Sequence, residues 1–241
     1  MTTLRSTLFL VGALLVTAVF GVLVSAGGIF GYRPASRLAQ IYCQILLKWV
    51  EWTCGIRYRV IGGENVPKDP VVVMAKHQSA WETLFMEGTF PPQCWIVKKE
   101  LLWLPFVGWG LLAVRCISID RSSGHTARDQ ILEQGAKRLK QGMWVSIFPE
   151  GTRIAPGKRG RYGIGGAYLA ARTGTPVLPI AHNAGEVWGR YAFRKHAGLI
   201  TVVIGPVIKT EGRTAADVNT EVEAWIEGRM REISPERYAA A

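Results

Sequence analysis

The sequence has few of the residues that build metal centres and nucleotide-binding loops. Only four cysteines and four histidines occur among its 241 residues, and no two cysteines have the close spacing of zinc ligands. The glycines at 160–166 do not follow a predicted strand, so they lack the context of a dinucleotide-binding loop. The Gly-x-Ser-x-Gly turn of serine hydrolases is also missing. We therefore expect no metal site and no cofactor, and we interpret the cysteines as buried thiols of a reducing compartment.

Acidic residues are scarce relative to basic ones. The chain has 18 aspartates and glutamates against 29 lysines and arginines, which gives a formal charge of +11. This balance favours anionic partners such as nucleic acids, lipid headgroups or phosphorylated substrates. The basic residues are scattered and form no nucleic-acid-binding motif, so we exclude a nucleic-acid partner. Nine tryptophans and a hydrophobic fraction of 49% instead favour a protein that works at a lipid bilayer.

Charged residues are absent from Leu8 to Phe30. An apolar helix of about 20 residues crosses a bilayer core of ~30 Å, so this run predicts a membrane helix. A cleaved secretory signal peptide is the alternative, because Arg5 precedes the run and small residues occur at 25–27. The run is longer than a signal-peptide core of about 7–15 residues, which favours a retained membrane anchor.

A second apolar segment runs from Leu38 to Trp52, with its large apolar residues at helical spacing. This pattern predicts an amphipathic helix that lies in the membrane interface or packs on the following domain. Arg33, Arg37 and Lys48 follow the first segment, whereas Arg5 alone precedes it. This distribution predicts attachment to the cell (inner) membrane with the following domain on the cytoplasmic face. A helical hairpin that dips into one leaflet is the alternative to a spanning helix.

From residue 56 onward, short apolar strands alternate with helical segments. This alternation is typical of an α/β domain with a mixed β-sheet flanked by helices. We therefore divide the chain into membrane-anchoring helices at 1–55 and an α/β domain at 56–241. The predicted strands cover 56–61, 70–75, 93–97, 114–119, 144–148, 177–181 and 200–208; one predicted helix begins at Trp81, and others cover 126–141, 161–172 and 215–233.

His77 and Glu82 are the first candidate site residues. His77 follows the strand predicted at 70–75, and Glu82 lies at the start of the next helix. Ligands in open α/β sheets bind at the carboxyl ends of strands. On one continuous helix the two side chains would lie about 140° apart, so a functional pair needs His77 on the turn before the helix. A carboxylate bound to one imidazole nitrogen then leaves the other nitrogen free to accept a proton. A surface histidine beside a solvated glutamate is the alternative for this segment alone.

A second polar segment, Glu150 to Arg153, follows the strand predicted at 144–148. Pro149 ends that strand because it has no N–H to donate. Gly151 lets the backbone approach a ligand closely, and the planar guanidinium of Arg153 suits a phosphate. A surface ion pair between Glu150 and Arg153 is the alternative.

Together, these segments resemble the sequence blocks of the glycerolipid acyltransferases that convert 1-acylglycerol 3-phosphate into phosphatidate. The family's first block is usually Asn-His-x4-Asp, and it occurs here as Lys76-His77-x4-Glu82. The third block matches Phe148 to Arg153 in full. The second block is similar to Ile117–Arg121, and the fourth is similar to Val177–Ala181. The resemblance covers roughly residues 56–210, with the four blocks in the family's order.

The resemblance implies transfer of a fatty acyl group from a thioester, either acyl-CoA or acyl carrier protein, to the 2-hydroxyl of lysophosphatidate. His77 is then the expected general base and Glu82 the residue that orients it. We expect backbone amides at the helix start after His77 to hold the oxyanion, and Ser79 to have a capping or packing role. The expected substrate-binding residues are Arg153, Glu150, Gly151, Thr152, Arg121 and Lys99.

Three other functions remain open from the sequence. One is acylation of a different lysolipid, such as a lyso-aminolipid, although the basic residues near Arg153 favour a phosphate-bearing acceptor. Another is a non-catalytic, membrane-associated lipid-binding protein of the same fold, which an intact His77 and Glu82 disfavour. The last is a hydrolase that uses the same histidine on water, which the missing nucleophile turn disfavours.

Overall fold

A mixed β-sheet forms the centre of the molecule. The structure is a computed structural model that describes residues 1–119 and 125–238. In this part of the chain the sheet has seven strands in the order β1-β7-β6-β2-β5-β3-β4. Neighbouring strands run parallel except β6 and β7, which are antiparallel. The strands are β1 (Ile56–Ile61), β2 (Val72–Ala75), β3 (Gln93–Lys98), β4 (Ile117–Ile119), β5 (Trp144–Ile147), β6 (Val177–His182) and β7 (Gly198–Ile204).

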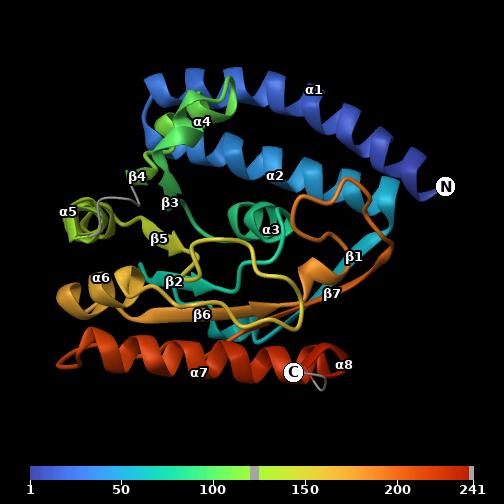
Figure 1. The fold of residues 1–241 in the computed structure, drawn as a ribbon. Coiled ribbons are helices and arrows are strands. Elements are labelled where there is room, and N and C mark those ends of the chain that lie inside the picture. Colours follow the sequence, from blue (N-terminus) through green and yellow to red (C-terminus); the bar gives the residue numbers. More distant parts are fainter. Residues whose placement is uncertain (120–124, 239–241) are drawn as a thin grey trace.

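Helices cover both faces of the sheet (Figure 1), and each face has its own hydrophobic core. One face carries α1 (Thr2–Ile29), α2 (Tyr32–Cys54) and α3 (Trp81–Thr89); the other carries α5 (His125–Lys140), α6 (Gly165–Thr173) and α7 (Ala215–Ile233). The shorter elements are α4 (Val107–Ala113), which packs beside α1, α8 (Pro235–Tyr238), and the 3-10 turns η1 (Gly63–Asn65), η2 (Lys99–Trp103) and η4 (Ala184–Glu186).

The central strand β2 separates the two cores. Its buried side chains alternate between the core shared with α5, α6 and α7 and the core shared with α2 and α3, as the pleat of a strand requires. The chain keeps this alternation beyond the end of the strand. Lys76 contacts Glu227 on α7, whereas His77 contacts Glu82 on α3. Two successive residues therefore face opposite helical layers.

Helix α1 lies lengthwise against α2 and is built into the fold (Figure 1). The hydroxyls of Thr17 and Tyr42 lie 2.9 Å apart across the two helices. The indole N–H of Trp49 donates to the carbonyl of Phe9 at 3.1 Å. Phe9 itself is buried in the core that α2 and α3 share with the sheet. Helix α1 therefore packs against α2 and the core, in addition to being apolar.

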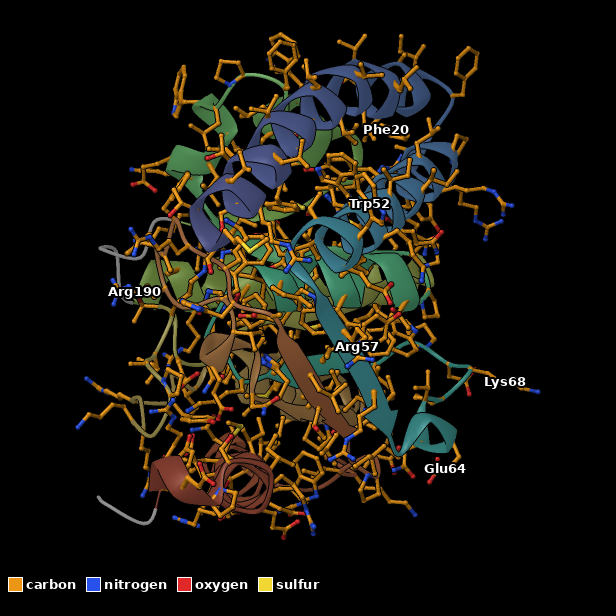
Figure 2. All side chains as sticks on the ribbon, turned by 90° about the vertical axis from the view of Figure 1, so that its right-hand side faces the viewer. Phe20, Trp52, Arg57, Glu64, Lys68 and Arg190 are labelled. Carbon is orange, nitrogen blue, oxygen red and sulfur yellow. The ribbon has the colours of Figure 1, made fainter. Side chains whose placement is uncertain are left out.

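The outer side of the α1–α2 pair is exposed and apolar. Within the described residues, α1 is the one helix long and apolar enough to cross a membrane, and Leu15 on it is 65% exposed. Figure 2 shows Phe20 and Trp52 on this helix pair in the upper part of the view, with Glu64 and Lys68 lower down on the right. Exposed apolar side chains are thus concentrated at one end of the molecule.

The predicted fold class is confirmed: a mixed α/β sheet flanked by helices, with an apolar first helix and an amphipathic second one. The strand at 56–61 and the helix at 215–233 have the predicted bounds. The helix expected at 161–172 begins only at Gly165, because Tyr162 turns inward and donates to Glu227 at 2.8 Å. The strand expected at 114–119 begins only at Ile117, because the chain up to Ala113 is helical.

The boundary proposed between residues 55 and 56 coincides with a turn. Helix α2 ends at Cys54, Gly55 has a φ of 73°, and β1 begins at Ile56. However, Phe9 and Val50 from the helix pair are buried in the same core as the sheet. The division of the chain into two domains therefore stays a prediction.

Candidate active site

His77 and Glu82 are in contact at the carboxyl end of β2. His77 stands on the turn after the strand, and Glu82 lies in the first turn of α3. The imidazole Nδ1 lies 2.8 Å from a carboxylate oxygen of Glu82. The other ring nitrogen, Nε2, has no hydrogen-bond partner among the residues that the structure describes. The glutamate side chain is 1% exposed and the histidine side chain 15%, so the ring alone is accessible to a reactant.

The Glu82 carboxylate is held by three donors. The same oxygen, Oε1, also accepts the backbone N–H groups of Gln78 at 2.9 Å and Ser79 at 2.8 Å. Burial favours the protonated carboxyl, but His182, His77 and the Ser79 N–H together hold the pKa of Glu82 below its ordinary value. An ionised Glu82 accepts a hydrogen bond from Nδ1–H of His77, so the proton of the neutral ring stays on Nδ1 and the lone pair of Nε2 points away from the carboxylate.

The turn that carries His77 is fixed by residues that follow β5. The Phe148 ring stacks on the imidazole, with 3.9 Å between ring centroids and 7° between the ring planes. The backbone N–H of Ile154 donates to the carbonyl of His77 at 2.8 Å. One oxygen of Glu150 accepts the backbone N–H of His77 at 2.9 Å. The two candidate segments, far apart in the sequence, therefore form one site.

Glu150 was expected to bind substrate, with an ion pair to Arg153 as the alternative, but its carboxylate is otherwise engaged. One oxygen binds the His77 N–H, and the other accepts from Nζ of Lys76 at 2.7 Å. The side chain of Glu150 is completely buried. Burial raises the pKa of Glu150, and the Lys76 ammonium partly offsets this effect. The geometry therefore gives Glu150 a role in holding the loop of His77.

Arg153 is the candidate phosphate-binding residue whose guanidinium is not engaged by another described side chain. Within the described residues, its guanidinium makes no hydrogen bond or ion pair; only its carbonyl is used, by Arg190 at 3.3 Å. Arg190, through a hydrogen bond, and the charges of Arg153 and Lys98 lower the pKa of the exposed Tyr191 phenol. Arg190, which Figure 2 labels, thus belongs to a group of cations around Arg153 that can attract an anion.

The other predicted substrate-binding residues have different surroundings. Gly151 has a φ of 65°, a conformation that suits glycine, and its N–H donates to the carbonyl of Phe148 at 3.0 Å. Thr152 and Lys99 are exposed, and Lys99 begins the turn η2. Arg121 lies outside the described residues.

The expectation that the first amides after His77 hold an oxyanion is wrong for three of them. The N–H groups of Gln78 and Ser79 donate to Glu82, and the N–H of Trp81 donates to the Ser79 hydroxyl at 3.2 Å. These donors serve the carboxylate and the start of α3. The N-cap of α3 is Ala80, which makes no side-chain cap hydrogen bond, so the Ser79 hydroxyl supports the turn before the helix and is not an N-cap.

His182 lies next to the site, although it stands outside the four sequence blocks. It is buried at the end of β6 and donates from Nε2 to the carbonyl of Lys76 at 2.8 Å. Its Nδ1 accepts the N–H of Ala184 at 3.3 Å. Burial lowers the pKa of His182, and the nearby Glu82 carboxylate partly offsets this effect. The only sequence signal for it was its position at the carboxyl end of a predicted strand.

The chain matches characterised proteins over most of its length. A sequence model of the acyltransferase family matches residues 57–183. A 1-acyl-sn-glycerol-3-phosphate acyltransferase from Pseudomonas aeruginosa is 47% identical over 201 residues, which cover 82% of this chain and 78% of that protein. The chain belongs to the acyltransferase family. A protein of the same description from Saccharomyces cerevisiae is 29% identical and covers 82% of this chain, which in turn covers 70% of it.

A solved structure shows the same fold for this acyltransferase. The crystal structure of the 1-acyl-sn-glycerophosphate acyltransferase from Thermotoga maritima superposes with a TM-score of 0.80 at 20% identity, covering 96% of this chain and 95% of the other. The protein is therefore an acyltransferase with the mixed α/β fold of that enzyme. The length and apolar composition of α1 are consistent with association of this enzyme with a membrane.

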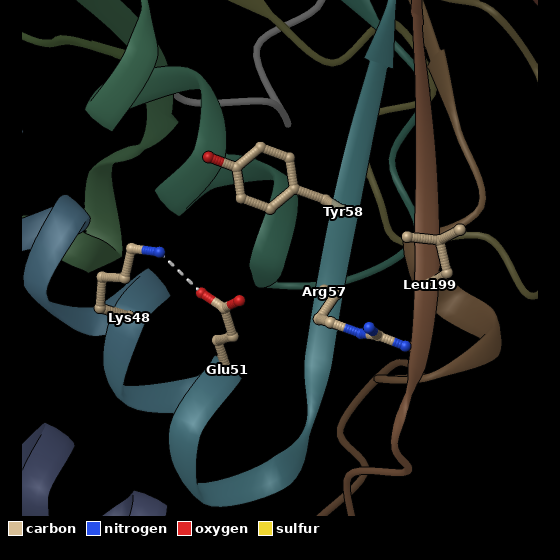
Figure 3. Close-up of a pocket in the computed structure, with 5 residues that line it drawn as sticks. All are labelled: Lys48, Glu51, Arg57, Tyr58 and Leu199. Carbon is tan, nitrogen blue, oxygen red and sulfur yellow. Dashed lines mark hydrogen bonds and ion pairs between the residues drawn. The ribbon is translucent and has the colours of Figure 1, made fainter.

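An open depression of about 510 Å³ lies away from this site (Figure 3). It is lined by Lys48, Glu51, Arg57, Tyr58 and Leu199, where α2 meets the edge strand β1. Lys48 and Glu51 form an ion pair of 2.9 Å there. None of the predicted site residues lines this depression, so it is separate from the site of His77 and Glu82.

Proposed function

We propose that this acyltransferase transfers a fatty acyl group from an acyl thioester to the 2-hydroxyl of 1-acylglycerol 3-phosphate, making phosphatidate for phospholipid synthesis. The observation that carries the proposal is the accessible His77 imidazole, bound to a buried Glu82 carboxylate, on a loop that Arg153's segment holds in place. The names of the relatives support the same acceptor.

The proposed chemistry needs a base for the acceptor hydroxyl. Nε2 of His77 takes the hydroxyl proton while the oxygen attacks the thioester carbonyl carbon. As the carbon–sulfur bond breaks, His77 returns the proton to the departing thiolate, so no acyl-enzyme intermediate is needed. Glu82 fixes the tautomer and stabilises the imidazolium. General base catalysis of this kind contributes about 10²–10⁴-fold to a rate.

We assign the acceptor's phosphate to Arg153. Arg153 is half-buried, and its guanidinium offers a planar pair of N–H donors that a phosphate accepts in two parallel hydrogen bonds. The positive charges of Arg190 and Lys98 near Tyr191 add to the attraction. Arg121 and Lys99 are the second and third candidates for binding this phosphate. Gly151 and Thr152, which directly precede Arg153, are the remaining candidates for contact with the substrate.

We infer that α1 lies along one leaflet and does not span the bilayer. Near its start, the Ser6 hydroxyl accepts the backbone N–H of Lys195 at 2.9 Å. Near its end, Gly28 lies so close to Ala113 that an added Cβ would be 2.8 Å from the alanine Cβ. A spanning helix would separate its ends by a core of ~30 Å, whereas both ends of α1 contact one domain. The positive residues that follow α1 support the cytoplasmic face of the inner membrane.

The test is an assay of membranes that contain this protein against several lysolipids, each with acyl-CoA and with acyl carrier protein as donor. We expect transfer to lysophosphatidate to exceed transfer to lysophosphatidylethanolamine and other lyso-aminolipids. A preference for a lyso-aminolipid would contradict the proposed acceptor. The donor that supports the higher kcat/KM is the preferred one. Both acyl-CoA and acyl carrier protein present the acyl group as a phosphopantetheine thioester, so either donor fits the proposed mechanism.

A further inference from the structure

Lys76 is a completely buried lysine between two glutamates. Its Nζ lies 2.7 Å from Oε1 of Glu150 and 2.7 Å from Oε1 of Glu227. It also lies 3.4 Å from the carbonyl of Lys158. The exposed fractions of the Lys76, Glu150 and Glu227 side chains are 0%, 0% and 4%. Such a lysine cannot contact a substrate, so any effect on the reaction must pass through its neighbours.

The cluster joins three distant parts of the chain. Lys76 follows β2, Glu150 follows β5, and Glu227 belongs to α7 on the opposite side of the sheet from α3. The phenol of Tyr162 donates to the same oxygen of Glu227 at 2.8 Å. Burial and the two carboxylates raise the pKa of Tyr162 far above its ordinary value, so the hydroxyl stays a donor. Helix α7 is thereby connected to the residue that precedes His77.

Glu150 is the connection between this cluster and the reacting group. Its second oxygen accepts the backbone N–H of His77 at 2.9 Å. With Lys76 in place, the cluster has one ammonium for two carboxylates, and Glu150 can remain ionised although it is buried. Without the ammonium, two buried carboxylates would face each other, and one would take up a proton or move. Either response would change the acceptor that holds the His77 backbone.

We propose that Lys76, Glu150 and Glu227 are positioning residues for acyl transfer, through which helix α7 fixes the backbone of His77 and hence the direction of its imidazole. This inference rests on the proposed role of His77 as the general base. A role in stability alone would lower the folded fraction of a variant but would leave the turnover of the folded protein unchanged.

The test is a double-mutant cycle with Lys76→Met, Glu227→Gln and the double variant in the full-length, membrane-bound protein. We expect Glu227→Gln to lower kcat about threefold to tenfold and Lys76→Met to lower it more, with KM for both substrates within about twofold of wild type. The double variant restores the net charge of the cluster, so its kcat should exceed that of Lys76→Met by about threefold. Three outcomes would overturn the proposal. One is a wild-type kcat in folded Glu227→Gln, and another is a kcat of the double variant no higher than that of Lys76→Met. The third is a change in KM without a loss of kcat.

A second readout does not depend on any substrate. Diethyl pyrocarbonate modifies accessible imidazoles, and peptide mass spectrometry separates His77 from the exposed His196. We expect Glu227→Gln and the conservative Tyr162→Phe to speed modification of His77 about twofold or more, with His196 unchanged. Glu223→Gln is the matched control, because Glu223 lies on the same helix and pairs with the exposed Arg159.

The two readouts separate the two hypotheses. An inactive wild-type protein with altered His77 reactivity in Glu227→Gln would refute the proposed acceptor and support the positioning role. An active wild-type protein whose His77 reactivity and kcat are both insensitive to Glu227→Gln and Tyr162→Phe would refute the positioning role and leave the proposed function standing.

Discussion

The ring of Phe148 contacts both the imidazole of His77 and the indole of Trp95. The two centroid distances are 3.9 Å to His77 and 5.4 Å to Trp95, and the Phe148 and His77 planes differ by only 7°. The indole is in turn fixed by its N–H, which donates to Glu87 at 2.7 Å. One face of the candidate base therefore rests on a rigid aromatic support, and the Glu82 hydrogen bond fixes its edge.

Replacing Phe148 by leucine should reduce turnover more than substrate binding. The flat contact with His77 would be lost while the apolar character stays, and aromatic pairs of this kind contribute about 0.5–1.5 kcal/mol. We expect kcat to fall about twofold to tenfold, with little change in KM for either substrate. Phe148→Tyr keeps the ring and is the control; equal losses in both variants would show that the stacking is irrelevant.

Removing the base should abolish transfer without unfolding the protein. His77→Ala should lower kcat about 10²–10⁴-fold, because no other described group is placed to take the hydroxyl proton. Glu82→Gln keeps the shape of the side chain but no longer stabilises the imidazolium, so it should also lose most activity. Circular dichroism and membrane fractionation should match wild type. Near-normal turnover of His77→Ala would refute the mechanism.

Replacing the guanidinium of Arg153 by an ammonium should weaken binding of the acyl acceptor more than binding of the acyl donor. Arg153→Lys keeps the charge but loses the parallel pair of hydrogen bonds, so KM for lysophosphatidate should rise about tenfold while KM for the acyl donor stays nearly constant. Arg121→Ala should act in the same direction. Steady-state kinetics with each substrate varied in turn will decide. If only donor use weakened in both variants, these arginines would bind the phosphates of the donor.

The stability of the fold should fall between acidic and neutral pH because of Glu87. This carboxyl is buried near the end of α3, and burial raises its pKa to about 7. The folded state therefore keeps a proton that the unfolded state releases at lower pH, so stability is fully present below the unfolded pKa and is lost as pH rises to about 7. The loss is on the order of 3 kcal/mol.

The check is thermal unfolding of Glu87→Gln and wild type at pH 5 and pH 8. The glutamine can still accept the Trp95 N–H and has no proton to release. Glu87→Gln should therefore gain relative to wild type at pH 8 and gain little at pH 5. The exposed Glu64 supplies the control variant, Glu64→Gln. Parallel pH profiles for wild type and Glu87→Gln would show that Glu87 is not protonated in the folded state.

Deleting residues 1–30 should release part of the protein from membranes and reduce activity on vesicles more than on short-chain, soluble lysolipid analogues. Residual binding is expected from α2 and the basic surface. Because Phe9 belongs to the core, the deletion also removes packing. Substituting the exposed Leu14, Leu15 and Val22 by serine avoids that loss, since they are 62%, 65% and 52% exposed. Equal activity of these variants and wild type on vesicles would mean that α1 only tethers the protein.

The features that could be predicted from the sequence are those set by a local residue pattern or by the spacing of two nearby residues. The strand at 56–61, the helix at 215–233 and the contact of His77 with Glu82 followed from periodicity and from the turn geometry. The partners of Lys76 could not be predicted in this way, because they lie 74 and 151 residues away in the sequence. The amides after His77 were misassigned because the carboxylate of Glu82 collects them, a competition that no linear pattern shows.

The contact between Lys76 and Glu227 has a consequence for the order in which the chain matures. The ribosome adds Glu227 151 residues after Lys76, which takes on the order of 10 s at the usual rates of synthesis. Until α7 is synthesised, the Lys76 ammonium lacks the Glu227 carboxylate and the packing of that helix. We therefore expect the loop of Lys76 and His77 to stay hydrated until then. A nascent chain could thus have its sheet largely assembled, and its first helix already at the bilayer, while it cannot yet transfer an acyl group.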